Sequence, residues 1–202
     1  MCSSDLHRLR GEAPPRLAAA PAGRMTSEAE GDAAKARFLG LLHEAAARAQ
    51  SIEFWWRDDD AEDATPALDR LLSLAKRYDL PLALAVVPKR ATAALADRLA
   101  SEPRVGVLQH GWQHRNHAAA NEKKIELGGA RPLAEMLDEL CSGRERLEAL
   151  FPKSFHPVLV PPWNRLADSV RGALSEAGLR GLSTIGPDRK STRLNSSHLF
   201  IS

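Results

Sequence analysis

Trp55-Trp56-Arg57-Asp58-Asp59-Asp60 ends a short apolar run in three consecutive carboxylates, and His110-Gly111-Trp112-Gln113-His114 follows further along the chain. Each segment comes directly after a predicted strand, residues 52–56 and residues 105–108. In parallel α/β folds, active sites assemble at the carboxyl ends of the strands. We therefore expect the two segments to meet at one edge of a parallel sheet.

One carboxylate and two imidazoles form a ligand set for a divalent metal ion. Zinc accepts both ligand types, and three protein ligands leave positions open for water and substrate. The two histidines are four residues apart, which places them on one face if this stretch is helical. Alone, the aspartates could form a solvated loop or a helix cap, and the histidines could be incidental. Their shared position predicts a catalytic site for zinc, with cobalt or manganese as alternatives.

The rest of the chain alternates strands and helices, which predicts an α/β class with a parallel sheet. Residue 66 begins a helix that Thr65 caps, and residues 82–87 form an apolar run typical of a strand buried on both faces. The further predicted helices are residues 34–50, 91–100, 132–150 and 166–177, and the further strands are residues 157–160 and 182–185.

Residues 115–129 have no apolar periodicity and predict a long loop after the second motif. A loop of this length is either a solvated connection or a functional segment. In the second case we expect it to contact the substrate rather than the metal. Its polar residues are Asn116, His117, Glu122, Lys123, Lys124 and Glu126.

The motifs resemble those of polysaccharide deacetylases, metal-dependent amidohydrolases that remove acetyl groups from amino sugars. That family carries Thr-Phe-Asp-Asp-Gly, then His-Ser/Thr-x-x-His, then Arg-x-Pro-Tyr. This chain has Arg57-Asp58-Asp59-Asp60, then the histidine segment, then Val160-Pro161-Pro162-Trp163-Asn164-Arg165. The resemblance covers residues 50–186, and it implies an incomplete, distorted (β/α) barrel.

The resemblance also implies the roles of individual residues. Asp58 is expected to be the catalytic base, and Asp59, His110 and His114 the metal ligands. The triple aspartate leaves a second register open, in which Asp59 and Asp60 are the pair. Val160 stands where the family has the arginine that orients the base. That role would pass to Arg57 or Arg165, or be absent.

Pro162, Trp163 and Asn164 are the expected substrate-binding residues. Two prolines stiffen the approach to Trp163, whose ring could stack on a sugar or serve as a core residue. By analogy with the family's tyrosine position, the backbone N–H of Trp163 is a candidate donor to the oxyanion of the reaction.

The implied function is metal-dependent removal of an acetyl group from an N-acetylated sugar or a related small amide. A non-catalytic carbohydrate-binding relative, or a metal-dependent hydrolase of another ester or a phosphate, are the alternatives. The family takes its general acid from a late Leu-x-His motif, and no Leu-x-His follows residue 165 in this sequence. We therefore expect a C-terminally truncated fragment that is inactive or only weakly active.

Both ends resemble translated adapter sequence rather than natural protein. They are residues 1–6 and residues 188–202. We expect residues 1–33 to be a disordered or partly non-native leader, residues 34–187 the deacetylase-like domain, and residues 188–202 a non-native tail.

Charge and hydropathy restrict the possible partners. Part of the formal net charge of +2 lies in the adapter-like ends, so nothing indicates nucleic-acid binding. No apolar run reaches the length of a membrane span. No secretory signal is recognisable, which favours a cytoplasmic location. The sequence does not determine the oligomeric state.

Overall fold

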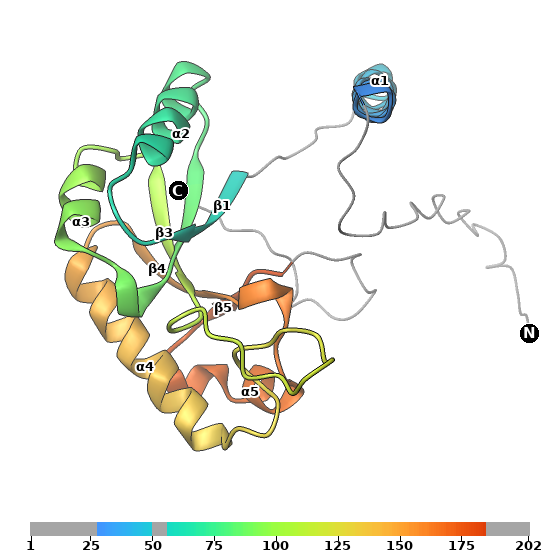
Figure 1. Ribbon diagram of the computed structural model, residues 1–202. Coiled ribbons are helices and arrows are strands. Elements are labelled where there is room, and N and C mark those ends of the chain that lie inside the picture. The colour runs from blue at the N-terminus through green and yellow to red at the C-terminus, as the bar shows by residue number, and fades with distance from the viewer. Residues whose placement is uncertain (1–27, 50–55, 185–202) are drawn as a thin grey trace, which may run out of the picture. The chain divides into compact units, whose positions relative to one another are not determined.

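The computed structural model describes residues 28–49 and 56–184, which belong to two separate compact units (Figure 1). Helix α1 (Glu28–Ala47) belongs to the first unit and begins earlier than predicted, with Phe38 and Leu41 about half exposed. The adapter-like ends lie outside the described residues, so their nature stays a prediction, as does a domain that begins at residue 34. In the described ranges, no helix combines the length and apolar character that crossing a membrane requires.

The second unit is built on a sheet of five parallel strands that follow one another in sequence order. This arrangement confirms the predicted α/β class. The strands are β1 (Trp56–Ala61), β2 (Leu82–Val86), β3 (Val105–His110), β4 (Phe155–Val160) and β5 (Gly181–Leu182).

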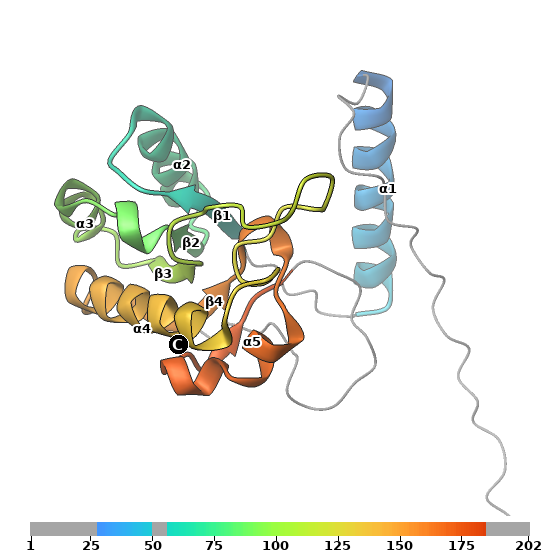
Figure 2. The ribbon, with the colours of Figure 1, turned by 60° about the horizontal axis from the view of Figure 1, so that its bottom comes forward.

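Three helices cover one face of this sheet, here called the outer face (Figures 1 and 2). They are α2 (Pro66–Arg77), α3 (Ala93–Leu99) and α4 (Leu133–Leu150). Thr65 caps α2 as predicted, because its hydroxyl accepts a hydrogen bond from Leu68 N at 3.1 Å. The outer-face core comprises Leu68, Leu72, Leu82, Leu84, Val86, Leu95, Leu99, Val105, Val107 and Leu147, among others.

The opposite, inner face carries a much smaller apolar cluster of Ala83, Ala85, Leu108 and Val160. The register pairs Arg57 with Ala83, so the Arg57 side chain lies on this face. Small side chains here leave room for polar groups at the carboxyl ends of the strands. The inner face is therefore where the polar motifs can meet.

Several element boundaries differ from the sequence prediction; β4 begins at residue 155 rather than 157, and β5 is Gly181–Leu182 rather than residues 182–185. The aspartates lie within β1 rather than after it, because pairing with β2 continues past a register shift between Asp58 and Ala61. Strand β3 extends to His110. The predicted helix 166–177 is divided into α5 (Asp168–Gly172) and the 3₁₀ turn η3 (Leu174–Ala177), with Gly178 following in the left-handed conformation at φ 73°.

Burial lowers the pKa of His156 on β4, and it is also the largest cause of the lowered pKa values of His110 and His117. Between the folded value and the unfolded value of about 6.5, the unfolded chain binds more protons. These histidines therefore contribute stability above about pH 6.5 that is lost as the pH falls.

We expect the urea midpoint of the metal-free chain to be lower at about pH 5.5 than at about pH 7.5. In His156→Gln we expect the difference between the two midpoints to be smaller. Asp58 has a raised pKa and acts in the opposite sense, so the difference between the two proteins isolates His156. An identical pH dependence in both proteins would contradict the assignment.

Candidate metal centre and active site

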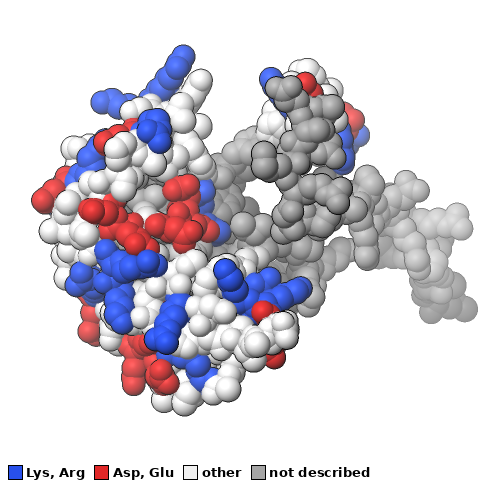
Figure 3. Space-filling view, viewed as in Figure 1, with Lys and Arg blue, Asp and Glu red and all other residues white. Residues whose placement is uncertain are grey.

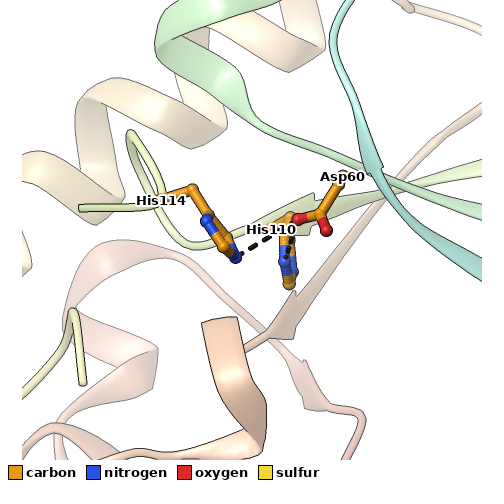
Figure 4. A group of neighbouring side chains, drawn as sticks. All are labelled: Asp60, His110 and His114. Atoms are coloured by element: carbon orange, nitrogen blue, oxygen red, sulfur yellow. Dashed lines mark ion pairs between the residues drawn. The ribbon is translucent and has the colours of Figure 1, made fainter. Parts of the chain in front are cut away.

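The carboxylate of Asp60 lies against both histidines of the second motif (Figure 4). Its Oδ1 atom is 3.0 Å from His110 Nε2 and 3.2 Å from His114 Nε2. Asp60 comes from the end of β1, His110 from the end of β3, and His114 from the loop that follows. Two strand ends and one loop therefore converge, as the sequence predicted for these motifs.

The backbone brings the two histidines together through a loop and not through a helix. Gly111 has φ 58° and His114 has φ 56°, both in the left-handed region. This stretch is therefore not helical, since successive residues of a helix need negative φ, and the condition for a shared helical face is not met. Asp60 also has a positive φ of 70°. Strained non-glycine residues of this kind cluster at functional sites.

His110 presents its Nε2 atom to the site in the form that a metal needs. Its Nδ1 atom lies 3.0 Å from the carbonyl oxygen of Val160, and a carbonyl only accepts hydrogen bonds. The neutral ring must therefore carry its proton on Nδ1, which leaves the Nε2 lone pair available. Burial is the largest cause of a lowered His110 pKa, which also favours the neutral ring.

Asp60, His110 and His114 fit a divalent ion by the chemistry and spacing of their donor atoms. The candidate ligand atoms all lie within 4.8 Å of one another. Two imidazole nitrogens and one carboxylate oxygen match the donor preference of zinc and of related first-row ions. His110 is 2% exposed, whereas the Asp60 side chain is 62% exposed, so the site is anchored inside and open outside.

Asp59 was the preferred metal ligand from the sequence, and the structure places it elsewhere. Its carboxylate is held by Arg57, with Nε to Oδ1 at 2.7 Å and an Nη2 donor to Oδ2 at 3.1 Å. Arg57 also donates to the hydroxyl of Ser183, at 2.6 Å, just after β5. The structure thus groups Asp60 with the histidines and Asp59 with Arg57, which matches the second register left open by the sequence.

Asp58, the expected base, lies on the other side of β1. Successive strand residues point to opposite faces. Asp58 therefore shares a side with Trp56, which packs against the outer-face core, while Arg57 and Asp59 share the inner side. Partial burial, followed by the charges of Asp59 and Asp60, raises the Asp58 pKa. The structure does not bring Asp58 to the histidines.

Val160 contributes to the site through its backbone. Its side chain is 1% exposed in the inner-face cluster, and its carbonyl accepts from His110 Nδ1 and from Gly111 N. Arg165 donates to the backbone oxygen of Lys124 and not to an aspartate. Of the two arginines proposed to replace the one missing at this position, Arg57 is the one that holds a site carboxylate.

Trp163 borders the site in the 3₁₀ turn η2 (Pro162–Asn164). Its ring centroid lies 4.4 Å from that of His114, and Lys124 Nζ lies 5.8 Å from the Trp163 ring centroid. Trp163 and Asn164 have φ values of 53° and 57°. Pro162 is buried, Trp163 is half-buried and Asn164 is exposed, so exposure rises along the three expected substrate residues.

Charge on this side of the molecule is divided between an acidic centre and basic borders. Figure 3 shows Asp and Glu side chains gathered where β1 ends, with Lys and Arg side chains around them. Asp58, Asp59 and Asp60 lie near the end of β1, and Lys124 Nζ lies 5.8 Å from the Trp163 ring centroid. An acidic centre of this kind attracts a cation.

Ser183 was not assigned a role from the sequence, and Glu126 was expected only as one of the polar residues of a solvated or substrate-contacting loop. Ser183 accepts a hydrogen bond from Arg57, and Glu126 is fully buried although it lies in the predicted polar loop. No local pattern marks Ser183. Glu126 had a signal, because it stands between the apolar residues Ile125 and Leu127 in a stretch that is otherwise polar.

A parallel β/α sheet with an Asp/His/His set at the carboxyl ends of its strands is an arrangement that can hold a catalytic metal ion. The sequence model of the family described as polysaccharide deacetylase matches residues 56–182. The chain belongs to this family. In a comparison with curated proteins, no match was found.

Solved structures agree with the fold at low sequence identity. IcaB from Ammonifex degensii is 10% identical, with 62% of this chain and 57% of that chain covered and a TM-score of 0.53. The deacetylase domain of BpsB from Bordetella bronchiseptica is 15% identical, with 65% and 63% covered and a TM-score of 0.52. BA3943 from Bacillus anthracis, described as a pseudoenzyme of carbohydrate esterase family 4, is 14% identical, with 66% and 44% covered and a TM-score of 0.49. The chain thus spans less than two thirds of each of these proteins.

Proposed function

We propose that this protein uses a divalent metal ion, zinc in the first instance, to hydrolyse an acetyl group from an N-acetylated sugar or a related small acetamide. The observation that carries this proposal is the convergence of Asp60, His110 and His114 beside the Arg57–Asp59 pair. Family membership supports the same reaction class.

The ligands of the ion would be Asp60, His110 and His114. When bound there, a divalent ion acidifies water and polarises a carbonyl oxygen. Asp59 would accept the proton of the attacking water at its carboxylate. Each carboxylate oxygen has two lone pairs, so the bonds from Arg57 leave acceptor capacity for that proton.

Arg57 would orient this base. Its guanidinium is 6% exposed and makes two parallel bonds to Asp59, a geometry with high directional specificity. The bond to Ser183 fixes the guanidinium from a second strand end. The backbone N–H of Trp163 is the proposed donor to the oxyanion, and its ring the proposed platform for the sugar.

The proposal is tested by metal titration of the metal-free chain, followed by an acetate assay. We expect one equivalent of Zn²⁺, Co²⁺ or Mn²⁺ to bind, and a chelator to remove both the ion and any acetate release. N-acetylglucosamine oligomers and p-nitrophenyl acetate are the substrates. The second substrate has a leaving group that needs no general acid, so it reports on the metal and base alone.

Two outcomes separate the alternatives. A chain that binds no metal would overturn the proposal. A chain that binds metal and oligosaccharide, but releases acetate from neither substrate, would support the alternative of a non-catalytic carbohydrate-binding relative. Turnover of phosphate or other ester substrates in place of acetamides would support the other alternative, a metal-dependent hydrolase of another ester or a phosphate.

A further inference from the structure

The loop that carries His114 is closed around a single buried side chain, that of Glu126. This residue is 0% exposed, in contrast to the solvated or substrate-facing loop predicted from the sequence. Its Oε1 atom accepts from Gln113 N at 2.8 Å and from Arg115 N at 3.2 Å, and its Oε2 atom accepts from Trp112 N at 3.1 Å. The carboxylate therefore binds the backbone on both sides of His114.

Glu126 is itself fixed from outside this loop. Arg131 donates to its carbonyl oxygen at 3.2 Å, and the Arg131 side chain is 8% exposed and paired with Glu135 and Glu139 on α4. The space for the carboxylate exists because residue 111 is glycine. A Cβ atom on Gly111 would overlap Glu126 Oε2. The buried position of the Glu126 carboxylate therefore depends on glycine at residue 111.

We propose that Glu126 is a positioning residue for the metal centre, because it holds His114 in its left-handed conformation with Nε2 directed at Asp60 Oδ1. A non-glycine residue at φ 56° persists only when its surroundings determine it. Converging backbone N–H groups form a nest for an anion, and the carboxylate fills it. Without the carboxylate, three N–H groups lose their acceptor and the loop relaxes away from the ligand geometry. This inference rests on the proposed metal site.

The test is metal affinity in Glu126→Gln, measured by Zn²⁺ and Co²⁺ titration of the metal-free chain. Glutamine keeps the size, but its amide has one acceptor oxygen instead of two, so its NH₂ group meets at least one of the backbone N–H groups that the carboxylate binds. We expect Kd to rise about 10- to 100-fold, as for other groups that orient metal ligands. The Co²⁺ absorption spectrum should also change, since it reports ligand geometry. Glu122→Gln is the matched control, because Glu122 lies in the same loop but is exposed.

The outcomes are distinct from those of the proposed function. An unmodified chain that binds no metal contradicts the proposed function, whereas equal Kd values and Co²⁺ spectra for the unmodified chain and a folded Glu126→Gln overturn the Glu126 assignment alone. A role in folding only would lower the unfolding midpoint and leave the Kd of the folded protein unchanged.

If Glu126→Gln does not fold, amide hydrogen exchange in the unmodified metal-free chain decides the question. The amides of Trp112, Gln113 and Arg115 should be protected. Rapid exchange at all three would overturn the proposal.

Discussion

Replacement of His114 by alanine is expected to abolish metal binding. His114 supplies one of three ligand atoms, and a carboxylate with a single imidazole leaves the ion mostly hydrated. The loss should exceed the 10- to 100-fold weakening typical of an outer group that only orients a ligand. His114 is a cleaner target than His110, because its side chain is 20% exposed and its removal leaves no closed cavity. Zinc titration by calorimetry measures the effect.

His43→Ala is the control for this experiment, because His43 is an exposed histidine of α1. It should bind zinc as the unmodified chain does. Circular dichroism of the metal-free proteins shows whether both variants remain folded. Undiminished zinc binding by folded His114→Ala would place the metal elsewhere and remove the basis of the proposed function.

Replacement of Asp59 by asparagine is expected to lower the rate of acetate release by about 10²- to 10⁴-fold, the range for loss of a general base. Asparagine cannot take a proton from water, but it keeps the size of the side chain. Zinc affinity should remain close to that of the unmodified chain, since Asp60 and not Asp59 faces the histidines. The rate is measured with p-nitrophenyl acetate, whose leaving group needs no general acid.

Asp58→Asn is the companion variant, because it distinguishes the two registers of the triple aspartate. Asp58 lies on the outer side of β1, so its replacement should change the rate far less than that of Asp59. The opposite ranking, with Asp58→Asn inactive and Asp59→Asn active, would restore the assignment first made from the sequence. A loss of zinc binding in Asp59→Asn would show that Asp59 is a ligand after all.

The sequence alone was sufficient for the class of the fold and for the segments that form the site. Apolar runs such as residues 82–87 and capped helices such as the one after Thr65 are local patterns, and the structure confirms both elements. The rule that active sites form at the carboxyl ends of parallel strands then placed the aspartates and histidines together. These inferences depend on the spacing of apolar residues and on the order of strands and helices along the chain, and both can be read from the sequence.

Only the tertiary structure decided which aspartate faces the histidines. Asp58, Asp59 and Asp60 are chemically identical and adjacent, so they differ only in the direction of their side chains. That direction depends on the register of β1 against β2, on the shift after Asp58 and on the positive φ of Asp60. Pairing of β1 with the distant strand β2 sets these features, and no local sequence pattern encodes that pairing.

The same reason explains the partners of the site. Arg57 could have been paired with an aspartate from the sequence, but it also donates to Ser183, which lies far along the chain. Glu126 can be buried because three backbone N–H groups donate to its carboxylate and Gly111 leaves space for it. The sequence of the loop alone does not show these donors. Burying a carboxylate is costly unless its hydrogen bonds are satisfied. Only the folded chain supplies those donors, so the residues that hold the metal ligands in place emerge with the tertiary structure.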